Sequence, residues 1–292
     1  MNFVRKLEQT KMLYLMILPS LLYFSIFIYF SIVNGTIISF QNFRFVGKSE
    51  FVGLKNYLEV FSTPGFWRVF KNTVILSSGN IILTALVPMA LALFINEISF
   101  SLWKRFLQTV VYLPYLFSWV VVGGIWIFLL SPDVGFINVF RTLLGMNPIY
   151  FLAKEAYARS ILIGVNLWKQ AGFVCILYLA SIAGINPELY EAAMIDGAGG
   201  FKKTLYITIP QLLDTLKIVL LLNVMGAFKL FDQIYVMRNE VIAQKVDVLM
   251  YYVYIKGLEE FKMGYAAAIS VVIFISALIL TLIIKRVIKY SV

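Results

Sequence analysis

Histidine is absent from this sequence of 292 residues, and its single cysteine, Cys175, lies inside an apolar run. These two scarcities exclude a disulfide framework, a Cys/His metal site and any nucleophile that depends on a histidine base. The 15 aspartates and glutamates fall mostly in predicted loops, without a cluster suited to holding a metal ion. We therefore expect no metal site in this chain.

Glycine-rich phosphate-binding motifs are missing as well. The sequence contains neither GxGxxG nor GxxxxGKS/T, so it shows no nucleotide site of its own. A membrane-bound enzyme would need catalytic groups gathered at one depth of the bilayer, and the sequence shows no such cluster. These absences favour a chain that is not itself an enzyme and holds no cofactor.

Charged residues are scarce, at 14% of the chain, whereas hydrophobic residues make up 61% and the mean hydropathy is +0.87. A soluble domain would carry about 25% charged residues, so the composition indicates a protein whose solvent is the bilayer. The net charge of +10 does not come from one basic stripe, because Lys and Arg punctuate apolar runs. We interpret the basic excess as a topology signal and expect no nucleic-acid partner.

Six apolar runs are long enough to cross a bilayer, which takes about 20 residues of α-helix. This pattern predicts an all-α integral membrane protein with six transmembrane helices in a single domain over residues 1–292. The predicted spans are Met12–Val33, Thr73–Ile95, Val110–Leu130, Ser160–Ala183, Leu213–Tyr235 and Gly264–Ile284.

The first run follows several basic residues, so a cleaved signal peptide is the alternative to a membrane anchor. Its apolar stretch is longer than that of a signal peptide, and no small-x-small cleavage site closes it, which favours a retained anchor. Basic residues are denser in the short segments on the side of the two termini, which predicts that both termini are cytoplasmic. The basic residues on that side are Arg5, Lys6, Lys11, Lys104, Arg105, Lys202, Lys203, Lys217, Lys285, Arg286 and Lys289.

Two predicted outward loops contain enough apolar residues to be folded. Residues 43–70 include the segment Phe51–Tyr57 and several further aromatic residues. The loop between spans three and four opens with the turn Ser131–Asp133 and continues with an apolar, helix-like stretch over Phe136–Leu144. Composition alone favours packing over the end of the bundle, and a docking surface for a partner protein is the alternative.

The cytoplasmic loop over residues 184–212 is predicted to contain a short capped helix. Asn186 is a good N-cap, Pro187 suits the first helical position, and Glu188 favours the positive end of a helix. The residues that then recur at helical spacing are Leu189, Ala192, Ala193 and Asp196.

Glycines end this helix. Gly197, Gly199 and Gly200 stop the helix and allow a sharp reversal of the chain. A second short helix over Phe201–Tyr206 is expected to end before Pro210, where the fifth span begins. The small residues on the first helix let another protein approach its backbone closely, which favours protein docking. An interfacial helix resting on lipid headgroups is the alternative, but it would have a broad Leu/Phe/Trp face.

The same loop resembles the EAA signature of permease subunits of bacterial ABC importers. The resemblance lies in Glu191–Ala193, then Asp196–Ala198, then Ile207 and Ile209–Pro210. It extends over most of the chain and is closest to maltose- and polysaccharide-type permeases. The other matching segments are Phe51–Tyr57, Asn72–Thr73, Leu113–Pro114, Gly123–Pro132, Tyr178–Asp196, Phe231–Asp232 and Gly264–Ala268.

One departure from this pattern concerns the third outward loop. Many members of the family carry a T-x-GGP turn after span five, where this sequence reads Met237-Arg238-Asn239. The missing glycine pair leaves the shape of this loop open.

The resemblance implies a type I importer fold with a cytoplasmic coupling helix in residues 184–212, in a bacterial inner or plasma membrane. Two separate ATPase subunits would bind ATP and Mg, and a second homologous permease and an extracytoplasmic solute-binding protein would complete the complex. The outward loops are then better explained as a docking surface for that binding protein. Glu191 would anchor the coupling helix on an ATPase subunit. The residues implied in coupling are Glu191, Ala192, Ala193, Asp196, Gly197 and Pro210.

The solute path is expected to consist of polar and aromatic groups within the spans, because ionisable groups there usually face a cavity or a partner. The resemblance implies a carbohydrate solute, and a lysine in the path would suit an acidic sugar. Each candidate has a structural alternative, namely helix-face pairing of Lys229 with Asp232, or an interfacial belt or ordinary packing for the tryptophans. The candidate pathway residues are Trp126, Asn166, Trp168, Lys169, Asn223, Lys229 and Asp232.

A secondary transporter, or another polytopic membrane protein without an ATPase partner, is the alternative function. It would need inverted repeats with spans broken by Gly or Pro at matching positions, and the sequence shows no such internal symmetry. Copurification of an ATPase subunit would distinguish the two functions.

Overall fold

The computed structural model describes residues 3–287 and the side chains from residue 11 onward, so Lys289 lies outside the described residues. Packing contacts divide the chain into two compact units. Unit 1 consists of Met1–Thr63 and Val253–Val272, and unit 2 consists of Pro64–Tyr252 and Ile273–Val292.

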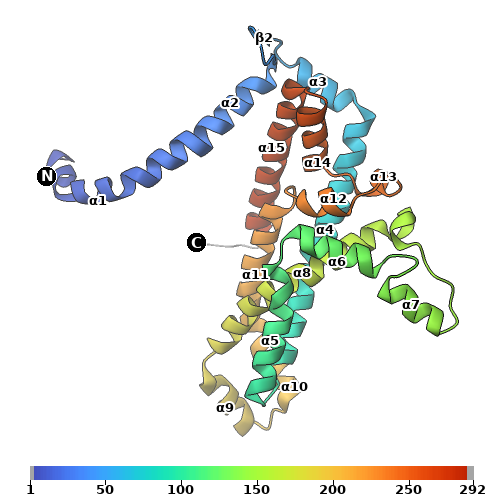
Figure 1. The fold of residues 1–292 in the computed structure, drawn as a ribbon. Helices are drawn as coiled ribbons and strands as arrows, with labels where there is room; N and C mark the ends of the chain where they lie inside the picture. Colours follow the sequence, from blue (N-terminus) through green and yellow to red (C-terminus); the bar gives the residue numbers. More distant parts are fainter. Residues whose placement is uncertain (1–2, 288–292) are drawn as a thin grey trace. The chain divides into compact units, whose positions relative to one another are not determined.

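Unit 1 begins with a continuous helical segment formed by α1 (Phe3–Tyr23), a π-helical turn (Phe24–Tyr29) and α2 (Phe30–Ser39) (Figure 1). Pro19 lies inside α1, and the π-helical turn follows it by one helical turn. The other elements of unit 1 are the antiparallel strands β1 (Gln41–Asn42) and β2 (Glu50–Phe51), helix α3 (Lys55–Ser62), the π-helical turn η4 (Ile255–Glu259) and the first part of α15 (Met263–Val287).

The side chain of Asn56 holds the two-stranded hairpin to the end of α2. Its Nδ2 donates to the carbonyl oxygens of Ser39, at 2.8 Å, and Gln41, at 3.0 Å. Gly264 lies against the same place, since a Cβ on it would collide with the Gln41 carbonyl and the Asn56 side chain. Two segments that resemble the family pattern, Phe51–Tyr57 and Gly264–Ala268, therefore meet in one packed cluster.

Unit 2 is built around three long helices that lie side by side, α4 (Pro64–Asn96), α8 (Glu155–Ala183) and α11 (Ile209–Gly226) (Figure 1). The shorter elements are α5 (Ser101–Leu116), α6 (Trp119–Leu129), α7 (Phe136–Leu143), η2 (Phe151–Ala153), α9 (Pro187–Ile195), α10 (Gly200–Lys203), η3 (Thr204–Thr208), α12 (Asp232–Met237), α13 (Ala243–Val246) and α14 (Leu249–Tyr254), of which α14 extends into unit 1.

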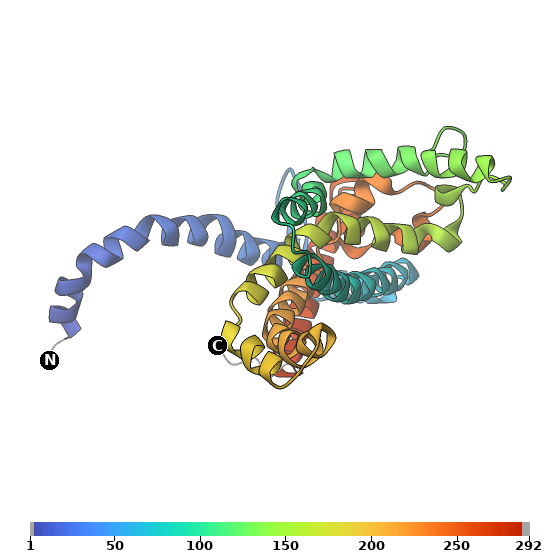
Figure 2. The ribbon, with the colours of Figure 1, turned by 90° about the horizontal axis from the view of Figure 1, so that it is seen from below.

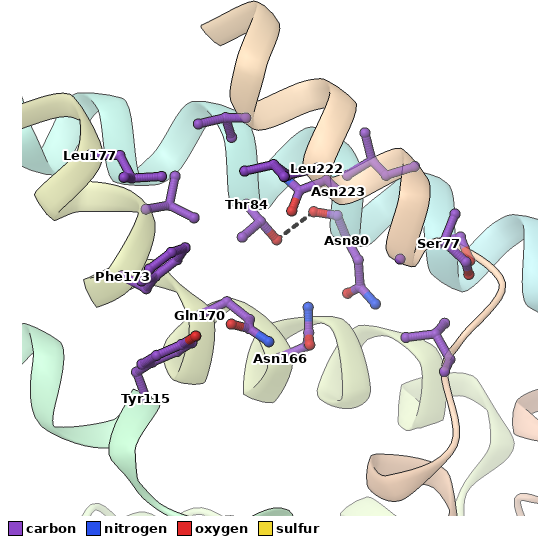
Figure 3. Close-up of a pocket in the computed structure, with 16 residues that line it drawn as sticks. Ser77, Asn80, Thr84, Tyr115, Asn166, Gln170, Phe173, Leu177, Leu222 and Asn223 are labelled. Atoms are coloured by element: carbon purple, nitrogen blue, oxygen red, sulfur yellow. Dashed lines mark hydrogen bonds between the residues drawn. The ribbon is translucent and has the colours of Figure 1, made fainter. Parts of the chain in front are cut away.

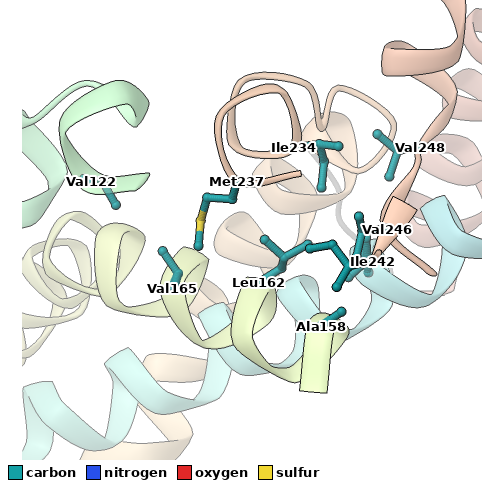
Figure 4. Close-up of a cluster of buried hydrophobic side chains, with 10 residues drawn as sticks. Val122, Ala158, Leu162, Val165, Ile234, Met237, Ile242, Val246 and Val248 are labelled. Atoms are coloured by element: carbon teal, nitrogen blue, oxygen red, sulfur yellow. The ribbon is translucent and has the colours of Figure 1, made fainter. Parts of the chain in front are cut away.

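Two apolar clusters hold unit 2 together. One joins α4, α8 and α11 towards the end that carries α9, and there the Tyr178 hydroxyl donates to the Ala85 carbonyl at 3.0 Å. The other joins the opposite half of α8 to α6 and the α12–α13 segment (Figure 4). Its buried members are Leu76, Val122, Ala158, Leu162, Val165, Ile234, Met237, Ile242, Val246 and Val248.

The expected membrane helices are present, and four of them extend beyond their predicted ends. Five helical segments are long and apolar enough to cross a membrane, or six if one bent pair counts as a single span. The segments that correspond to predicted spans one, two, four and six are Lys11–Ser39, Pro64–Asn96, Glu155–Ala183 and Met263–Val287.

The third predicted span, Val110–Leu130, is not one straight helix. It is divided between α5 and α6, which meet at an angle of 104°. Figure 2, which looks along α5, shows α6 running sideways from its end. Pro114 lies near the end of α5, and the side-chain oxygen of Ser118 accepts from the Val121 amide and so caps α6. A hydropathy window does not detect this elbow because both arms are apolar.

The prediction for the fifth span was wrong at both ends. Residues Gly200–Gly226 form one helical segment, so no break precedes Pro210. The π-helical turn η3 ends two residues before Pro210, and its wider turn accommodates a residue without an amide hydrogen. At the other end the helix stops at Gly226, and residues 227–231 form a turn and an irregular segment instead.

Candidate functional site

A cavity of about 260 Å³ lies between α4, α8 and α11 in unit 2 (Figure 3). Its walls combine amides and hydroxyls with apolar and aromatic side chains. The lining residues are Ser77, Asn80, Ile81, Thr84, Tyr115, Asn166, Gln170, Phe173, Val174, Leu177, Val219, Leu222, Asn223, Gly226, Ala227 and Leu230.

The polar groups of the cavity come from three different helices. Asn80 is on α4, Asn166 and Gln170 are on α8, and Asn223 is on α11. In the described part of the chain, the buried Oδ1 of Asn80 and Nδ2 of Asn223 have no hydrogen-bond partner. A buried polar atom without a partner costs free energy, so an added hydrogen-bond partner at either amide would be stabilising.

An aromatic pair forms another wall of the cavity. The rings of Tyr115 and Phe173 are stacked, with centroids 4.9 Å apart and planes inclined by 14°. Figure 3 shows the pair beside Gln170 and Asn166 on the same side of the cavity. A stacked pair presents an apolar face next to the amides, an arrangement that suits a ligand with both polar edges and apolar faces.

The structure brings only some of the predicted pathway residues to this cavity. Asn166 and Asn223 line it, whereas Trp126, Trp168 and Lys169 do not. The two tryptophans instead contact each other edge to face at 5.7 Å. The structure leaves their predicted role in solute transport untested.

Sequence reasoning missed most of the lining residues, among them Asn80, Gln170 and Tyr115. Asn80 and Gln170 are polar groups inside predicted spans, so that signal was available for them. Tyr115 is an aromatic residue within a predicted span, but the sequence did not distinguish it from other aromatic residues there, because its place in the wall depends on the elbow between α5 and α6.

Lys169 points into the elbow between α5 and α6. Its Nζ donates to the carbonyl oxygens of Phe117, at 2.5 Å, and Tyr115, at 3.0 Å, and reaches the Pro114 carbonyl at 3.5 Å. The ammonium group also lies over the rings of Tyr115, at 5.6 Å, and Trp119, at 5.5 Å. Lys169 is only 7% exposed, so its charge is stabilised by groups of this chain.

The predicted pairing of Lys229 with Asp232 was wrong. It assumed one helix over Leu213–Tyr235, but α11 ends at Gly226, and Asp232 begins α12. Both side chains are exposed, and no ion pair joins them within residues 3–287. Neither residue lines the cavity.

The capped helix predicted in residues 184–212 is confirmed as α9. The Glu188 amide donates to the Asn186 side-chain oxygen at 3.1 Å, and Pro187 is the first helical residue. Gly197 follows the helix with φ +75°, a left-handed conformation that favours glycine.

Helix α9 is fixed to the following helical segment, while its signature residues stay accessible. The Tyr190 hydroxyl and the Thr208 Oγ1 are hydrogen-bonded at 2.9 Å. Glu191, Ala192 and Asp196 are exposed. Apolar side chains beside them are also exposed, among them Ile195 at 88%. The helix lies at one end of unit 2, with α12 and α13 towards the other end (Figure 1).

The loop after α12, which lacks the glycine pair, is held by polar contacts instead. The Asn239 Oδ1 accepts from the amides of Val241 and Ile242, and its Nδ2 donates to the Leu152 carbonyl at 2.9 Å. The Arg238 guanidinium donates to the Asp247 carboxylate at 2.9 Å. Burial raises the pKa of Asp247, and Arg238 counteracts part of that rise.

Comparison with known proteins agrees with this architecture. No protein-family model matches the chain. The chain is similar to the "Polygalacturonan/rhamnogalacturonan transport system permease protein YteP" of Bacillus subtilis (strain 168), with 37% identity over 97% of this chain and 89% of YteP. It is also similar to "Protein LplB" of the same organism, with 34% identity over 92% of this chain and 86% of LplB.

A solved structure is similar over the whole chain. It is the bacterial alginate ABC transporter in complex with an alginate pentasaccharide-bound periplasmic protein, with a TM-score of 0.91 and 30% identity, and all of both chains is covered. The fold and these likenesses define a polytopic membrane protein with the architecture of an ABC importer permease. The chain belongs to the permease subunits of binding-protein-dependent sugar ABC importers.

Proposed function

We propose that this chain conducts an oligosaccharide, or a fragment of a polysaccharide, across the membrane in an ATP-driven import complex. The observation that carries the proposal is the cavity between α4, α8 and α11, where amides from three helices face a stacked aromatic pair. Sugars are polar at their edges and apolar on their ring faces, so this combination of groups is complementary to them.

The relatives support the size and class of the solute. YteP is named for polygalacturonan and rhamnogalacturonan, and the similar solved transporter imports the acidic polysaccharide alginate. Asn80 and Asn223 have unpaired atoms, which a sugar hydroxyl satisfies as donor to one and acceptor from the other.

We propose that α9 couples ATP hydrolysis to transport. The exposed apolar side chains of Leu189, Met194 and Ile195 would enter a cleft on an ATPase subunit, with Glu191 as a polar anchor. Gly197 forms the turn of the chain that exposes this face of α9. Pro210 lies in the following helical segment, which would transmit movements of α9 to the transmembrane helices. The complete coupling set is Glu191, Ala192, Ala193, Asp196, Gly197 and Pro210.

The proposed complex contains two ATPase subunits that hold ATP and Mg, a second homologous permease and an extracytoplasmic solute-binding protein. The outward loops, including the Asn56 cluster of unit 1, would dock the binding protein. Both chain termini would be cytoplasmic. A secondary transporter would need no ATPase, so copurification of ATPase subunits with this chain supports the proposal, and a purified chain that transports without them contradicts it.

The cavity is tested by uptake of labelled oligosaccharides into proteoliposomes that contain the assembled complex, ATP and the binding protein. We expect Asn223→Leu to lower uptake at subsaturating solute by about tenfold, the factor that loss of about 1.4 kcal/mol of hydrogen bonding produces. Met225→Leu is the matched control, because Met225 is on the same helix, is 51% exposed and does not line the cavity.

Peptides and amino acids serve as the opposing solutes in the same assay. If the wild-type complex imports only these, the carbohydrate assignment is wrong. If Asn223→Leu and Met225→Leu import oligosaccharide at the same rate as wild type, the cavity is not the solute path.

A further inference from the structure

We infer that Lys169 is a positioning residue that clamps the end of α5 and thereby holds Tyr115 in the cavity wall. Because Lys169 is engaged in this way, the cavity recognises the hydroxyl groups and ring faces of a sugar and not a carboxylate. The inference deepens the proposed function and rests on it for its solute readout. It explains the one lysine that is buried among the described residues of unit 2.

The elbow creates a need for hydrogen-bond donors. Helix α5 ends at Leu116, and α6 leaves it at 104°, so the last carbonyls of α5 lack their usual helical amide partners, although the Phe117 amide reaches the Pro114 carbonyl at 3.3 Å. The bilayer interior offers no water to such carbonyls, so an unpaired carbonyl there is strongly unfavourable. Lys169 supplies the donors from α8, across a sequence separation of 52 to 55 residues.

The same contact stabilises the ammonium charge. The C-terminal end of a helix carries partial negative charge, which favours a cation placed there. The rings of Tyr115 and Trp119, both within 5.6 Å of Nζ, add cation–π attraction. An ammonium has three N–H donors, and three carbonyls lie within reach of them. No donor is left over for a solute carboxylate.

The spacing of residues on α8 separates two functions. Asn166, Gln170 and Phe173 recur at helical intervals and line the cavity. Lys169 and Gly172 are three residues apart and contact α5, since a Cβ on Gly172 would collide with the backbone of Val111 and Tyr112. Helix α8 therefore packs against α5 with one face and lines the solute cavity with the adjacent face.

Tyr115 is the link between the two faces. Its carbonyl accepts from Lys169, and its ring stacks on Phe173 in the cavity wall. If the end of α5 loosens, the ring loses its fixed place against Phe173. The cavity lining contains no Asp, Glu, Lys or Arg among the described residues, so its selectivity acts on neutral sugar groups.

A double-mutant cycle tests the link through Tyr115. The KM for uptake is measured for Lys169→Met, Tyr115→Ala and the double variant. The solutes are a neutral oligogalactoside and an oligogalacturonate of equal length, and each is used if the wild-type complex imports it. We expect each single change to raise KM by about tenfold and the double change to raise it no further, because both remove the same stacked wall. Lys169→Arg should keep KM within about threefold of wild type, since it retains charged donors.

Two outcomes overturn the inference in this arm. If the rise in KM of the double variant equals the product of the two single rises, Lys169 acts independently of Tyr115. Where both sugars are imported, a selective loss of the oligogalacturonate in Lys169→Met would mean that the ammonium binds the carboxylate. If Lys169→Met does not insert in the membrane, Lys169→Gln takes its place in the cycle with a smaller expected rise in KM, because its amide keeps two uncharged N–H donors.

A second arm needs no solute and so separates failure of this inference from failure of the proposed function. Spin labels at Leu102→Cys on α5 and Phe128→Cys on α6, both exposed positions, report the elbow distance in a Cys175→Ala background. We expect a narrow distance distribution in the otherwise unchanged chain and in Lys169→Arg, and a broader one in Lys169→Met. An equally narrow distribution in Lys169→Met would overturn the clamp, even if the complex imports no oligosaccharide at all.

Discussion

At the scale of single residues, Gly197 is the position where backbone conformation alone predicts a functional defect. Its φ of +75° is unfavourable for a β-branched residue by roughly 1–2 kcal/mol, although a Cβ there would meet no neighbour. We expect Gly197→Val to abolish most solute-dependent ATPase activity of the complex, because the chain would leave α9 in a different direction. The variant should still insert in the membrane.

Gly199 provides the matched control for this change. It is also surrounded by open space, but its φ of −68° and ψ of 169° accept any side chain. Gly199→Val should therefore retain near wild-type activity. Normal ATPase activity in Gly197→Val would contradict the proposed role of this turn in coupling.

A second prediction at this scale concerns the buried pair of Arg238 and Asp247. Their side chains are 19% and 14% exposed, and removal of the cation leaves a buried carboxylate without its counter-charge. We expect Arg238→Met to destabilise the loop over residues 238–247 by about 3 kcal/mol, and the double change with Asp247→Asn to recover most of that loss. Thermal unfolding of the purified complex measures both, and equal melting temperatures for the single and double variants would argue against the pair.

At the scale of elements, the contact between α5 and α8 depends on Gly172. An added Cβ there would collide with the α5 backbone at Val111 and Tyr112, which has no flexible end that can move aside. We expect Gly172→Ala to separate the two helices and to cost about 1–3 kcal/mol of stability. Thermal unfolding followed by tryptophan fluorescence measures this cost.

Gly164→Ala is the matched control, since Gly164 is on the same helix and a Cβ there would meet nothing within 4 Å. That substitution should leave stability unchanged or raise it by a few tenths of a kcal/mol to about 1 kcal/mol, because alanine favours a helix over glycine. If both variants unfold at the same temperature, close approach at Gly172 does not hold α5 in place.

At the scale of the whole molecule, the spans and the density of basic residues predict the topology. With six spans, the two termini are on the same side, and the loop after the first span is on the other. A reporter fused after Val292 should behave as cytoplasmic, and one inserted near Lys48 as external. The reverse pattern at the two sites would contradict the topology.

The sequence by itself determined which segments enter the membrane and where α9 begins and ends. Hydropathy sums over a window, and the bilayer requires about 20 apolar residues, so four of the six predicted runs lie within single continuous helical segments. The cap at Asn186 and the turn at Gly197 are local, because each depends on one side chain and its neighbours in the chain. Local chemistry of this kind can be predicted without knowing the fold.

Only the tertiary structure decided the elbow, the end of the fifth span and the membership of the cavity. A hydropathy window measures how apolar a segment is but not the direction in which it runs, so the 104° bend between α5 and α6 left no trace in it. Asn80, Gln170 and Tyr115 become neighbours through helix packing. The sequence around Lys169 is the same whether its side chain faces a solute or a helix end. The carbonyls that it binds lie at the end of α5, more than 50 residues away in the chain. The role of a buried charge is set by the groups that surround it in space, which the order of residues in the chain does not specify.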